Sequence, residues 1–361
     1  MWSLDSHPPQ EKDEPMINEQ PLETARSNRA LALFAAIIAA VALALCFTLL
    51  GCSSSNDQKA DLSEYANEAD ALRIGSMKGP TSIGLASMMD QEQGQFTVVG
   101  AADELTPLLL QDQIDIALVP ANVAAVLYAR TEGQIQVIDV NTLGVLYGIS
   151  LDESVSNVED LRGRTVYMTG KGTVPEYTFM ALLAAANIST DEVTIEFCSE
   201  PTEVVAQIAQ HDDAVGILPQ PYATACTLKN ERLHTVLDLT EAWAQMTGGQ
   251  KGDVVTGVTV AKTSTIEEHQ GAIELFLQRH AASAEVAQTD PSAIVAKVTE
   301  LGIIENETLA EKAIPNCNVV CYTGEEMKSA LSGYLQALFD QSAEALGGSL
   351  PGDDFYFMPE N

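Results

Sequence analysis

The chain has 361 residues, more than a single hydrophobic core usually serves, so two lobes are expected. Hydrophobic residues make up 46% and charged residues 19%, which is the balance of a globular protein and excludes a disordered one. An acidic count of 51 against 18 basic residues gives a net charge of -33, which repels phosphate backbones and argues against nucleic-acid binding.

The N-terminus contains an uncharged, Ala/Leu/Ile-rich run over residues 30–50, which follows two arginines. A positive flank, an apolar core and a small residue before the break are typical of a secretory signal. The sequence Leu49-Leu50-Gly51-Cys52 resembles the bacterial lipobox, in which the cysteine carries a diacylglycerol. This resemblance implies that residues 1–51 are a lipoprotein signal and that Cys52 is the lipid anchor. Because the run is long enough to span a bilayer, an uncleaved transmembrane helix is the alternative.

The residues before this run hold six acidic and three basic side chains, which is unusual for a signal. Translation from Met16 would give a more ordinary signal. Residues 52–69 are rich in Ser, Asn, Asp and Glu, and this composition predicts a flexible tether between lipid and body. We therefore expect the protein at the extracytoplasmic face of the cell membrane, with the membrane contacted through the lipid.

From Leu72 onward, short apolar strands alternate with segments that carry apolar residues at helical spacing. The predicted strands are 73–77, 96–100, 115–120 and 135–141, and the predicted helices between them are 82–93, 104–111 and 122–132. Such alternation implies βαβ units and a mostly parallel sheet.

Two stretches of the body follow one plan: Asp112–Leu127 and His211–Cys226 each have an acidic turn, an apolar strand, a proline and then a helix. A second matched pair, Met77–Ser82 and Gly170–Pro175, follows a strand upstream of each. These repeats predict that each half forms one α/β lobe. The strand ends of both lobes are expected to face a common cleft, because ligands bind beyond the carboxyl ends of such strands.

The predicted domain organisation follows from these repeats. Residues 70–152 form the first part of lobe 1, residues 153–253 form lobe 2, and residues 254–361 form the return to lobe 1 with the C-terminal helices. The connections are expected at 144–151 and 254–262, and two crossings suit a hinge that closes on a ligand. The closing helical stretches are predicted at 266–288, 292–302 and 325–346.

Several short motifs of the body carry a family resemblance. They are Lys78-Gly79-Pro80-Thr81, Asp115–Asn122, Asn141-Thr142-Leu143-Gly144, Asp160–Val166, Leu218-Pro219-Gln220-Pro221 and Ile314–Asn318. In these motifs the chain resembles the substrate-binding proteins of ABC importers in the nitrate, sulfonate and taurine group, which includes binders of thiamine-pyrimidine precursors. The resemblance implies a type II periplasmic-binding fold, an α/β fold of two mixed sheets flanked by helices around a cleft. It also implies a small-molecule ligand, no chemistry on it, and handover to the importer's permease subunits.

The residues expected to hold the ligand lie where strands meet helices. They are Lys78, Gly79, Pro80, Thr81, Ser82, Asn122, Asn141, Thr142, Lys171, Gly172, Thr173, Val174, Gln220 and Tyr222. Free N–H groups at helix starts favour anionic or acceptor-rich groups, and a nearby lysine strengthens that preference. Two lysines converging on one cleft favour a small organic anion, such as a sulfonate or carboxylate. An uncharged heterocycle, held by the neutral side chains, is the alternative.

Other chemistries find little support in the sequence. The run Gly170–Thr173 is similar to a phosphate-binding loop, but Thr165 stands where that loop needs its first glycine. The five histidines show no metal-binding spacing, and His211, His269 and His280 are predicted to lie on solvated surface. We therefore expect no cofactor, no metal and no catalytic residue. The alternatives are an extracytoplasmic enzyme on the same fold and a membrane-anchored ligand sensor.

Four cysteines follow the proposed anchor in the chain: Cys198, Cys226, Cys317 and Cys321. Export makes disulfides permissible, and four cysteines allow three pairings. Buried free thiols are at least as well supported, because an extended segment would hold the last two too far apart to bridge.

Overall fold

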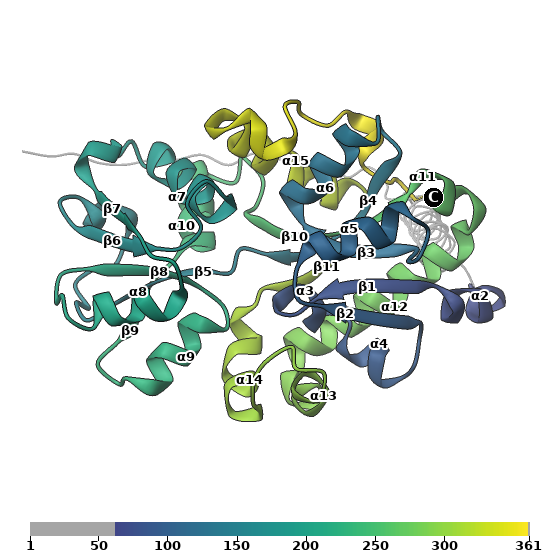
Figure 1. The fold of residues 1–361 in the computed structure, drawn as a ribbon, viewed down its shortest axis with the longest axis horizontal. Helices are drawn as coiled ribbons and strands as arrows, with labels where there is room; N and C mark the ends of the chain where they lie inside the picture. The colour runs from purple at the N-terminus through teal and green to yellow at the C-terminus, as the bar shows by residue number, and fades with distance from the viewer. Residues whose placement is uncertain (1–61, 360–361) are drawn as a thin grey trace, which may run out of the picture. The chain divides into compact units, whose positions relative to one another are not determined.

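Two β-sheets organise residues 62–359, the part of the chain that the computed structural model describes (Figure 1). Sheet A orders six strands as β11 (Val319–Tyr322), β4 (Ile135–Leu143), β10 (Val255–Lys262), β3 (Ile116–Pro120), β1 (Arg73–Met77) and β2 (Gln95–Val99). Sheet B orders five as β7 (Thr194–Phe197), β6 (Thr165–Met168), β8 (Val215–Pro219), β5 (Leu146–Ser150) and β9 (His234–Asp238). Both sheets contain parallel and antiparallel pairs, so the predicted fold class is confirmed.

The helices of lobe 1, which is built on sheet A, come from both ends of the described chain. They are η1 (Ser63–Tyr65), α2 (Ala66–Ala71), α3 (Pro80–Ile83), α4 (Ala86–Asp90), α5 (Ala102–Leu110), α6 (Ala121–Arg130), α11 (Thr263–Glu268), α12 (Gln270–Thr289), η4 (Pro291–Ala293), α13 (Val295–Glu300), α14 (Glu307–Ala313), η5 (Ile314–Asn316), α15 (Gly324–Gln341), η6 (Ala343–Leu346) and η7 (Asp353–Phe355). Lobe 2, built on sheet B, has η2 (Val158–Leu161), α7 (Val174–Ala185), η3 (Thr190–Glu192), α8 (Pro201–Ile208), α9 (Tyr222–Lys229) and α10 (Leu239–Thr247).

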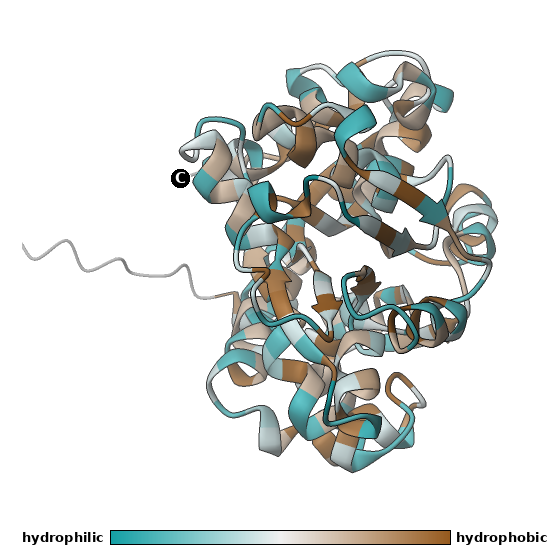
Figure 2. Cartoon of the chain, turned by 90° about the vertical axis from the view of Figure 1, so that its left-hand side faces the viewer, coloured by the Kyte–Doolittle hydropathy of each residue, from teal (hydrophilic) through white to brown (hydrophobic). Residues whose placement is uncertain are grey.

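The strands carry mostly hydrophobic residues, and hydrophilic residues gather on the outer helices and turns (Figure 2). The central strands β3 and β5 are buried along almost their whole length, which matches their continuous apolar sequences. Burying such strands between helix layers provides the main driving force for this fold.

The predicted helix over 82–93 is instead two short helices, α3 and α4. Gly84 and Leu85 separate them, and Gly84 packs closely under α12. A Cβ at Gly84 would lie 3.1 Å from His280 Nε2 and from Val319 Cγ1, so a larger residue would crowd both side chains at this bend. The helical spacing of the apolar residues was correct, but it did not reveal this bend.

The tether prediction is wrong for residues 62–69, which fold onto lobe 1 as η1 and part of α2. Leu62 and Ala69 are buried, and Glu68 and Asp70 pair with His269 and Arg279 of lobe 1. Apolar burial at this spacing overcomes the polar composition, so the body begins at Leu62. The signal run, Cys52 and residues 52–61 of the tether lie outside the described residues. Within 62–359, no helix is both apolar and long enough to cross a membrane.

The chain first crosses between lobes at Gly144 and Val145, because β4 ends at Leu143 and β5 begins at Leu146. The boundary predicted at residue 152 left β5 with lobe 1. Instead β5 pairs antiparallel with both β8 and β9 of sheet B, which buries all five of its residues. The second crossing leads into β10, which begins at Val255.

Helix α15 joins the two lobes from the lobe 1 side. The hydroxyl groups of Tyr334 and of Thr178 in α7 form a buried hydrogen bond of 2.8 Å. The ring of Tyr334 also meets Trp243 of α10 edge-on, with centroids 6.3 Å apart. Residues of both lobes thereby share one hydrophobic cluster.

The four described cysteines are free thiols. Burial raises the pKa of Cys226 to about 11 and that of Cys317 to about 12, so both are protonated at neutral pH. The sequence left both disulfides and free thiols open, and the structure has free thiols at these four positions.

An ion pair at the start of β1 makes stability depend on pH. Arg73 donates hydrogen bonds to Asp115 from its backbone N–H and its guanidinium, the shortest at 2.5 Å. Burial alone would raise the pKa of Asp115, but the hydrogen bonds and charge of Arg73 outweigh it and lower that pKa below its usual value. A lowered folded pKa stabilises the protein above the unfolded pKa, and this contribution is lost as the pH falls through the folded pKa.

We therefore expect Arg73→Gln to lower the free energy of unfolding at pH 7 by on the order of 1 kcal/mol, a value limited by solvent screening. The difference from the wild type should begin to shrink below about pH 4, the usual pKa of Asp115 in the unfolded chain, and should be lost as the pH falls through the lower folded pKa. Urea unfolding at several pH values measures it. Arg232→Gln is the matched control, because Arg232 and Asp212 lie 3.8 Å apart and are 72% and 90% exposed. Equal pH profiles for both variants would contradict the expectation.

Candidate functional site

Three of the predicted site residues come together at the end of sheet A: Thr81, Asn141 and Thr142. All three are buried, and they surround Gly257 of β10. The Thr142 hydroxyl donates to Asn141 Oδ1 at 2.9 Å, and Asn141 Nδ2 donates to Thr259 Oγ1 at 3.1 Å. These neutral donors and acceptors lie where β4 leaves for lobe 2.

A buried polar network continues from this cluster into lobe 1. Thr259 Oγ1 donates to Asp139 Oδ1 at 2.7 Å, and Asp139 Oδ2 lies 3.0 Å from His280 Nδ1. Because the Thr259 proton goes to the carboxylate, its oxygen accepts from the Asn141 amide. These hydrogen bonds fix the orientation of the Asn141 amide, so that its oxygen faces Thr142.

A cavity of about 300 Å³ lies beside this cluster, at the lobe 1 end of the crossing. Its walls come from the end of β4, the end of α12, η5 and β11: Leu143, Ala287, Gln288, Ile314, Pro315, Asn318, Val319, Val320 and Tyr322. Thr142 pairs with Val319 in the sheet, so the polar cluster and the cavity wall are neighbours. The volume is at the small end of the range for ligand pockets.

Two hydrogen bonds tie lobe 1 to β5 and the first crossing beside this cavity. The Tyr147 hydroxyl of β5 donates to the Asn316 carbonyl at 2.8 Å, and Asn318 Nδ2 donates to the Gly144 carbonyl at 2.6 Å. Burial and the charge of Asp238 raise the pKa of Tyr147, so it remains a protonated donor. The cavity wall is therefore held against the crossing.

The lobe 2 loop, Lys171 to Thr173, is occupied by its own contacts. Lys171 Nζ lies 5.4 Å from the centre of the Phe197 ring, a cation–π contact. Gly172 N–H donates to Glu176, and the Thr173 hydroxyl donates to the Gly170 carbonyl. Lys171, Gly172 and Thr173 are exposed, and Val174 begins α7 half-buried.

The lobe 1 loop places Lys78 at the surface, with its Nζ 3.6 Å from where a Cβ on Gly302 would lie. Gly79, at φ 114°, forms the turn that places Pro80 at the first position of α3. The Ser82 hydroxyl is fully buried and donates to the Met77 carbonyl. The prediction of an anionic ligand required Lys78 and Lys171 to converge on one cleft, but the two side chains contact different neighbours.

The remaining predicted residues lie on other elements, α6 and α9, and at the end of β8. Asn122 is half-buried in the first turn of α6. The buried Gln220 accepts from the Thr224 hydroxyl at 2.8 Å, which engages its amide oxygen inside lobe 2. Tyr222 is 48% exposed and lines a shallow groove between α8 and α9, which has about 150 Å³.

Sequence reasoning missed two kinds of residue that the structure brings forward. Asn318 and Leu143 line the cavity although both stood within recognised motifs, and the Pro-Asn-Cys-Asn run was the available signal. The surface prediction for His280 is wrong, because α12 turns that side chain into the core with no exposure. Apolar spacing along α12 is too irregular to show which face is buried. His269 does lie at the surface, 41% exposed.

Comparison with models of protein families identifies the family to which the chain belongs. The model of the family described as menaquinone biosynthesis, VitK2_biosynth, matches residues 72–338. The chain belongs to this family.

Several solved structures have the same fold as this member of the menaquinone biosynthesis family. An ABC transporter protein from Parabacteroides distasonis is 22% identical, with a TM-score of 0.66 over 81% of this chain and 99% of that one. The periplasmic aliphatic sulphonate binding protein SsuA from Escherichia coli is 15% identical, with a TM-score of 0.61 over 81% and 93%. Alkanesulfonate-binding SsuA from Xanthomonas axonopodis pv. citri is 15% identical, with a TM-score of 0.53 over 78% and 95%. Comparison with curated proteins gives no match.

These likenesses establish the type II periplasmic-binding fold, as the sequence motifs implied. The family that matches is a biosynthetic one, however, and not the importer group that the motifs resemble. Fold and family are therefore settled, and the activity is not fixed by either.

The polar cluster can be tested through Gly257, because a Cβ there would lie 2.4 Å from Asn141 Oδ1 and 2.6 Å from Thr81 Cγ2. We expect Gly257→Ala to cost about 1–3 kcal/mol of unfolding free energy through overpacking. Urea unfolding measures the loss. Gly100→Ala is the control, because its Cβ would meet only the end of the Glu104 side chain. Equal effects would contradict this packing.

Proposed function

We propose that this protein captures a small molecule beside the crossing between its lobes and delivers it to the permease of an ABC importer. One observation carries the proposal: the cavity of about 300 Å³ is walled by residues that adjoin the buried cluster of Asn141 and Thr142. The amide of Asn141 and the hydroxyl of Thr142 are groups that can recognise a ligand through hydrogen bonds. The importer-type proteins that share the fold support handover as the purpose of binding.

The cavity favours an uncharged ligand over the anion first expected. Most of its wall residues are apolar, but polar and apolar atoms line it about equally, and Gln288, Asn318 and Tyr322 contribute neutral polar groups. Burial and the nearby carboxylates of Asp253 and Glu326 raise the pKa of Tyr322, which places negative charge and not positive charge near this wall. We therefore propose a small neutral ring with hydrogen-bonding groups.

Calorimetric titration with the extracted ligand tests this ligand class. Lys78→Gln and Lys171→Gln should each lose less than about 0.5 kcal/mol of binding free energy, the scale of an exposed charge contact. A loss several times larger in either variant would restore the anion.

The proposed location rests on Cys52, because the lipobox resemblance places that residue at the end of an apolar run. Two acyl chains on one cysteine anchor a protein firmly, whereas one chain does not. We expect Cys52→Ser to release the protein from the membrane fraction or to leave it as an unprocessed precursor. Fractionation and intact mass are the measurements. Wild-type retention with an unchanged mass would instead establish an uncleaved helix.

The family match favours a second candidate, an enzyme on the same fold that acts on a small organic molecule. The hydrogen-bonded pair of Asp139 and His280 is a fully buried group that suits acid–base chemistry. It reaches the cluster only through Thr259 and Asn141.

The fate of the bound molecule separates the two candidates. The compound that copurifies is identified by native mass spectrometry and extraction, and is then incubated in excess with fresh protein. Recovery of the compound unchanged after many equivalents supports capture and delivery. Steady conversion to a product of different mass, lost in Asp139→Asn, would overturn the proposal in favour of the enzyme.

A further inference from the structure

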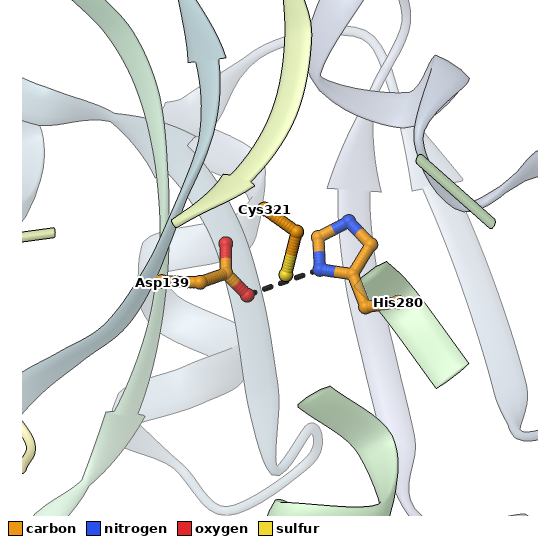
Figure 3. A group of neighbouring side chains, drawn as sticks. All are labelled: Asp139, His280 and Cys321. Carbon is orange, nitrogen blue, oxygen red and sulfur yellow. Dashed lines mark hydrogen bonds and ion pairs between the residues drawn. The ribbon is translucent and has the colours of Figure 1, made fainter. Parts of the chain in front are cut away.

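Three side chains of different chemistry converge inside lobe 1, on elements far apart in the sequence (Figure 3). Asp139 comes from β4, His280 from α12 and Cys321 from β11. A carboxylate oxygen, an imidazole nitrogen and the sulfur atom all lie within 4.8 Å of one another. Asp139 and His280 have no exposed surface, while Cys321 is partly buried.

We propose that Asp139, His280 and Cys321 form a binding site for a zinc-class divalent cation. Oxygen, nitrogen and sulfur ligands around zinc lie about 2.0–2.3 Å from the ion, which sets the ligand atoms roughly 3.3–3.8 Å apart in a tetrahedron. The observed 3.0 Å between His280 Nδ1 and Asp139 Oδ2 already approaches that spacing. The three ligand atoms lie within 4.8 Å of one another, so side-chain shifts of about 1 Å would complete the site.

Charge supports the same assignment. A carboxylate and a thiolate together carry two negative charges, so a divalent cation would make the buried group neutral. A thiol that coordinates such a cation is deprotonated, and its proton is released.

The surroundings supply part of a second layer of contacts. Thr259 holds the other Asp139 oxygen at 2.7 Å, as outer hydrogen bonds do for metal-ligating carboxylates. Among the described residues, His280 Nε2 is a buried atom without a hydrogen-bond partner. Metal-ligating histidines usually donate their second ring N–H to a partner, so Nε2 is the position at which this second layer is incomplete.

The donor set also selects the class of ion. Thiolate and imidazole ligands favour zinc and its neighbours, whereas magnesium and calcium prefer oxygen ligands alone. Three protein ligands leave a fourth position for water. The half-buried Cys321 provides the side from which ion and water can enter.

Cobalt and zinc titrations of chelator-treated full-length protein test the site. We expect one equivalent of Co²⁺ to bind, to produce a thiolate-to-metal charge-transfer band in the near ultraviolet, and to be displaced by Zn²⁺. Cys321→Ser should abolish the band and weaken Zn²⁺ binding by at least about 10-fold, and His280→Asn should weaken binding similarly. Calorimetry in two buffers should show proton release on binding.

The other free thiols provide matched controls. Cys198→Ser and Cys226→Ser should keep both band and stoichiometry, because neither thiol belongs to the cluster. Circular dichroism establishes that each variant is folded, and Cys321→Ala replaces Cys321→Ser if that protein is not. Failure of wild-type protein to bind one equivalent of Co²⁺, or a band that survives in the folded Cys321 variant, would overturn the proposal.

Discussion

Trp243→Ala is expected to lower the free energy of unfolding by about 3–5 kcal/mol, the range for truncating a large buried aromatic side chain. Trp243 of α10 is 1% exposed, and its ring packs against the Tyr334 ring of α15. Its Nε1–H donates to the Gly252 carbonyl at 3.0 Å, just before the second crossing. The substitution therefore removes apolar burial, an aromatic contact and a hydrogen bond at the place where the lobes join.

Urea unfolding followed by far-ultraviolet circular dichroism measures this loss. Trp243→Phe should lose less, because it keeps most of the buried ring and gives up the hydrogen bond. Leu228→Ala, at a residue of α9 that is 48% exposed, should stay within about 0.5 kcal/mol of the wild type. A Trp243→Ala loss no larger than that of Leu228→Ala would mean that α15 does not join the lobes in solution.

Asp139→Ala should cost a comparable 3–5 kcal/mol, because removing one partner of a buried polar pair leaves the others without partners. His280 Nδ1 and the Thr259 hydroxyl both lose their hydrogen-bond partner. The Asn141 amide then has no fixed orientation, so binding of the extracted ligand should weaken as well. Unfolding is measured with a chelator present, so that bound metal contributes nothing.

A double-mutant cycle isolates the contact between Asp139 and His280. The variants are Asp139→Ala, His280→Ala and the two combined, and residues in one hydrogen-bond network couple by about 0.5–3 kcal/mol. Asp139→Asn should lose less than Asp139→Ala because it keeps an acceptor for Thr259. Additive losses in the cycle would show that the pair makes no net contribution to stability.

The sequence was informative wherever structure depends on local pattern. Alternating apolar strands and helices predicted β1 and β3 to within a residue, because buried strands demand largely apolar sequence. The two related halves likewise predicted two lobes. Residues 62–69 were mispredicted because a few apolar side chains among polar ones are enough to dock a short helix on a larger body.

The candidate site was predictable only in part, because side-chain direction depends on tertiary contacts. Asn141 and Thr142 were found from their place at a strand end, and the structure does group them. Lys78 and Lys171 lie in equivalent turns of the two lobes, but Lys78 lies beside Gly302 and Lys171 beside the Phe197 ring. The spacing of residues in the sequence does not reveal these contacts. His280 and Cys321 are separated by 41 positions along the chain, so no local motif could have joined them to Asp139.

Native mass spectrometry of wild-type protein beside Leu143→Trp tests the central claim most directly. The larger ring should fill the cavity of about 300 Å³ from its partly exposed side. We predict that a small-molecule adduct on the wild type is absent from folded Leu143→Trp and is retained by Leu228→Trp, on an exposed face of α9. An adduct of equal mass and abundance on all three proteins would contradict binding at the crossing between the lobes.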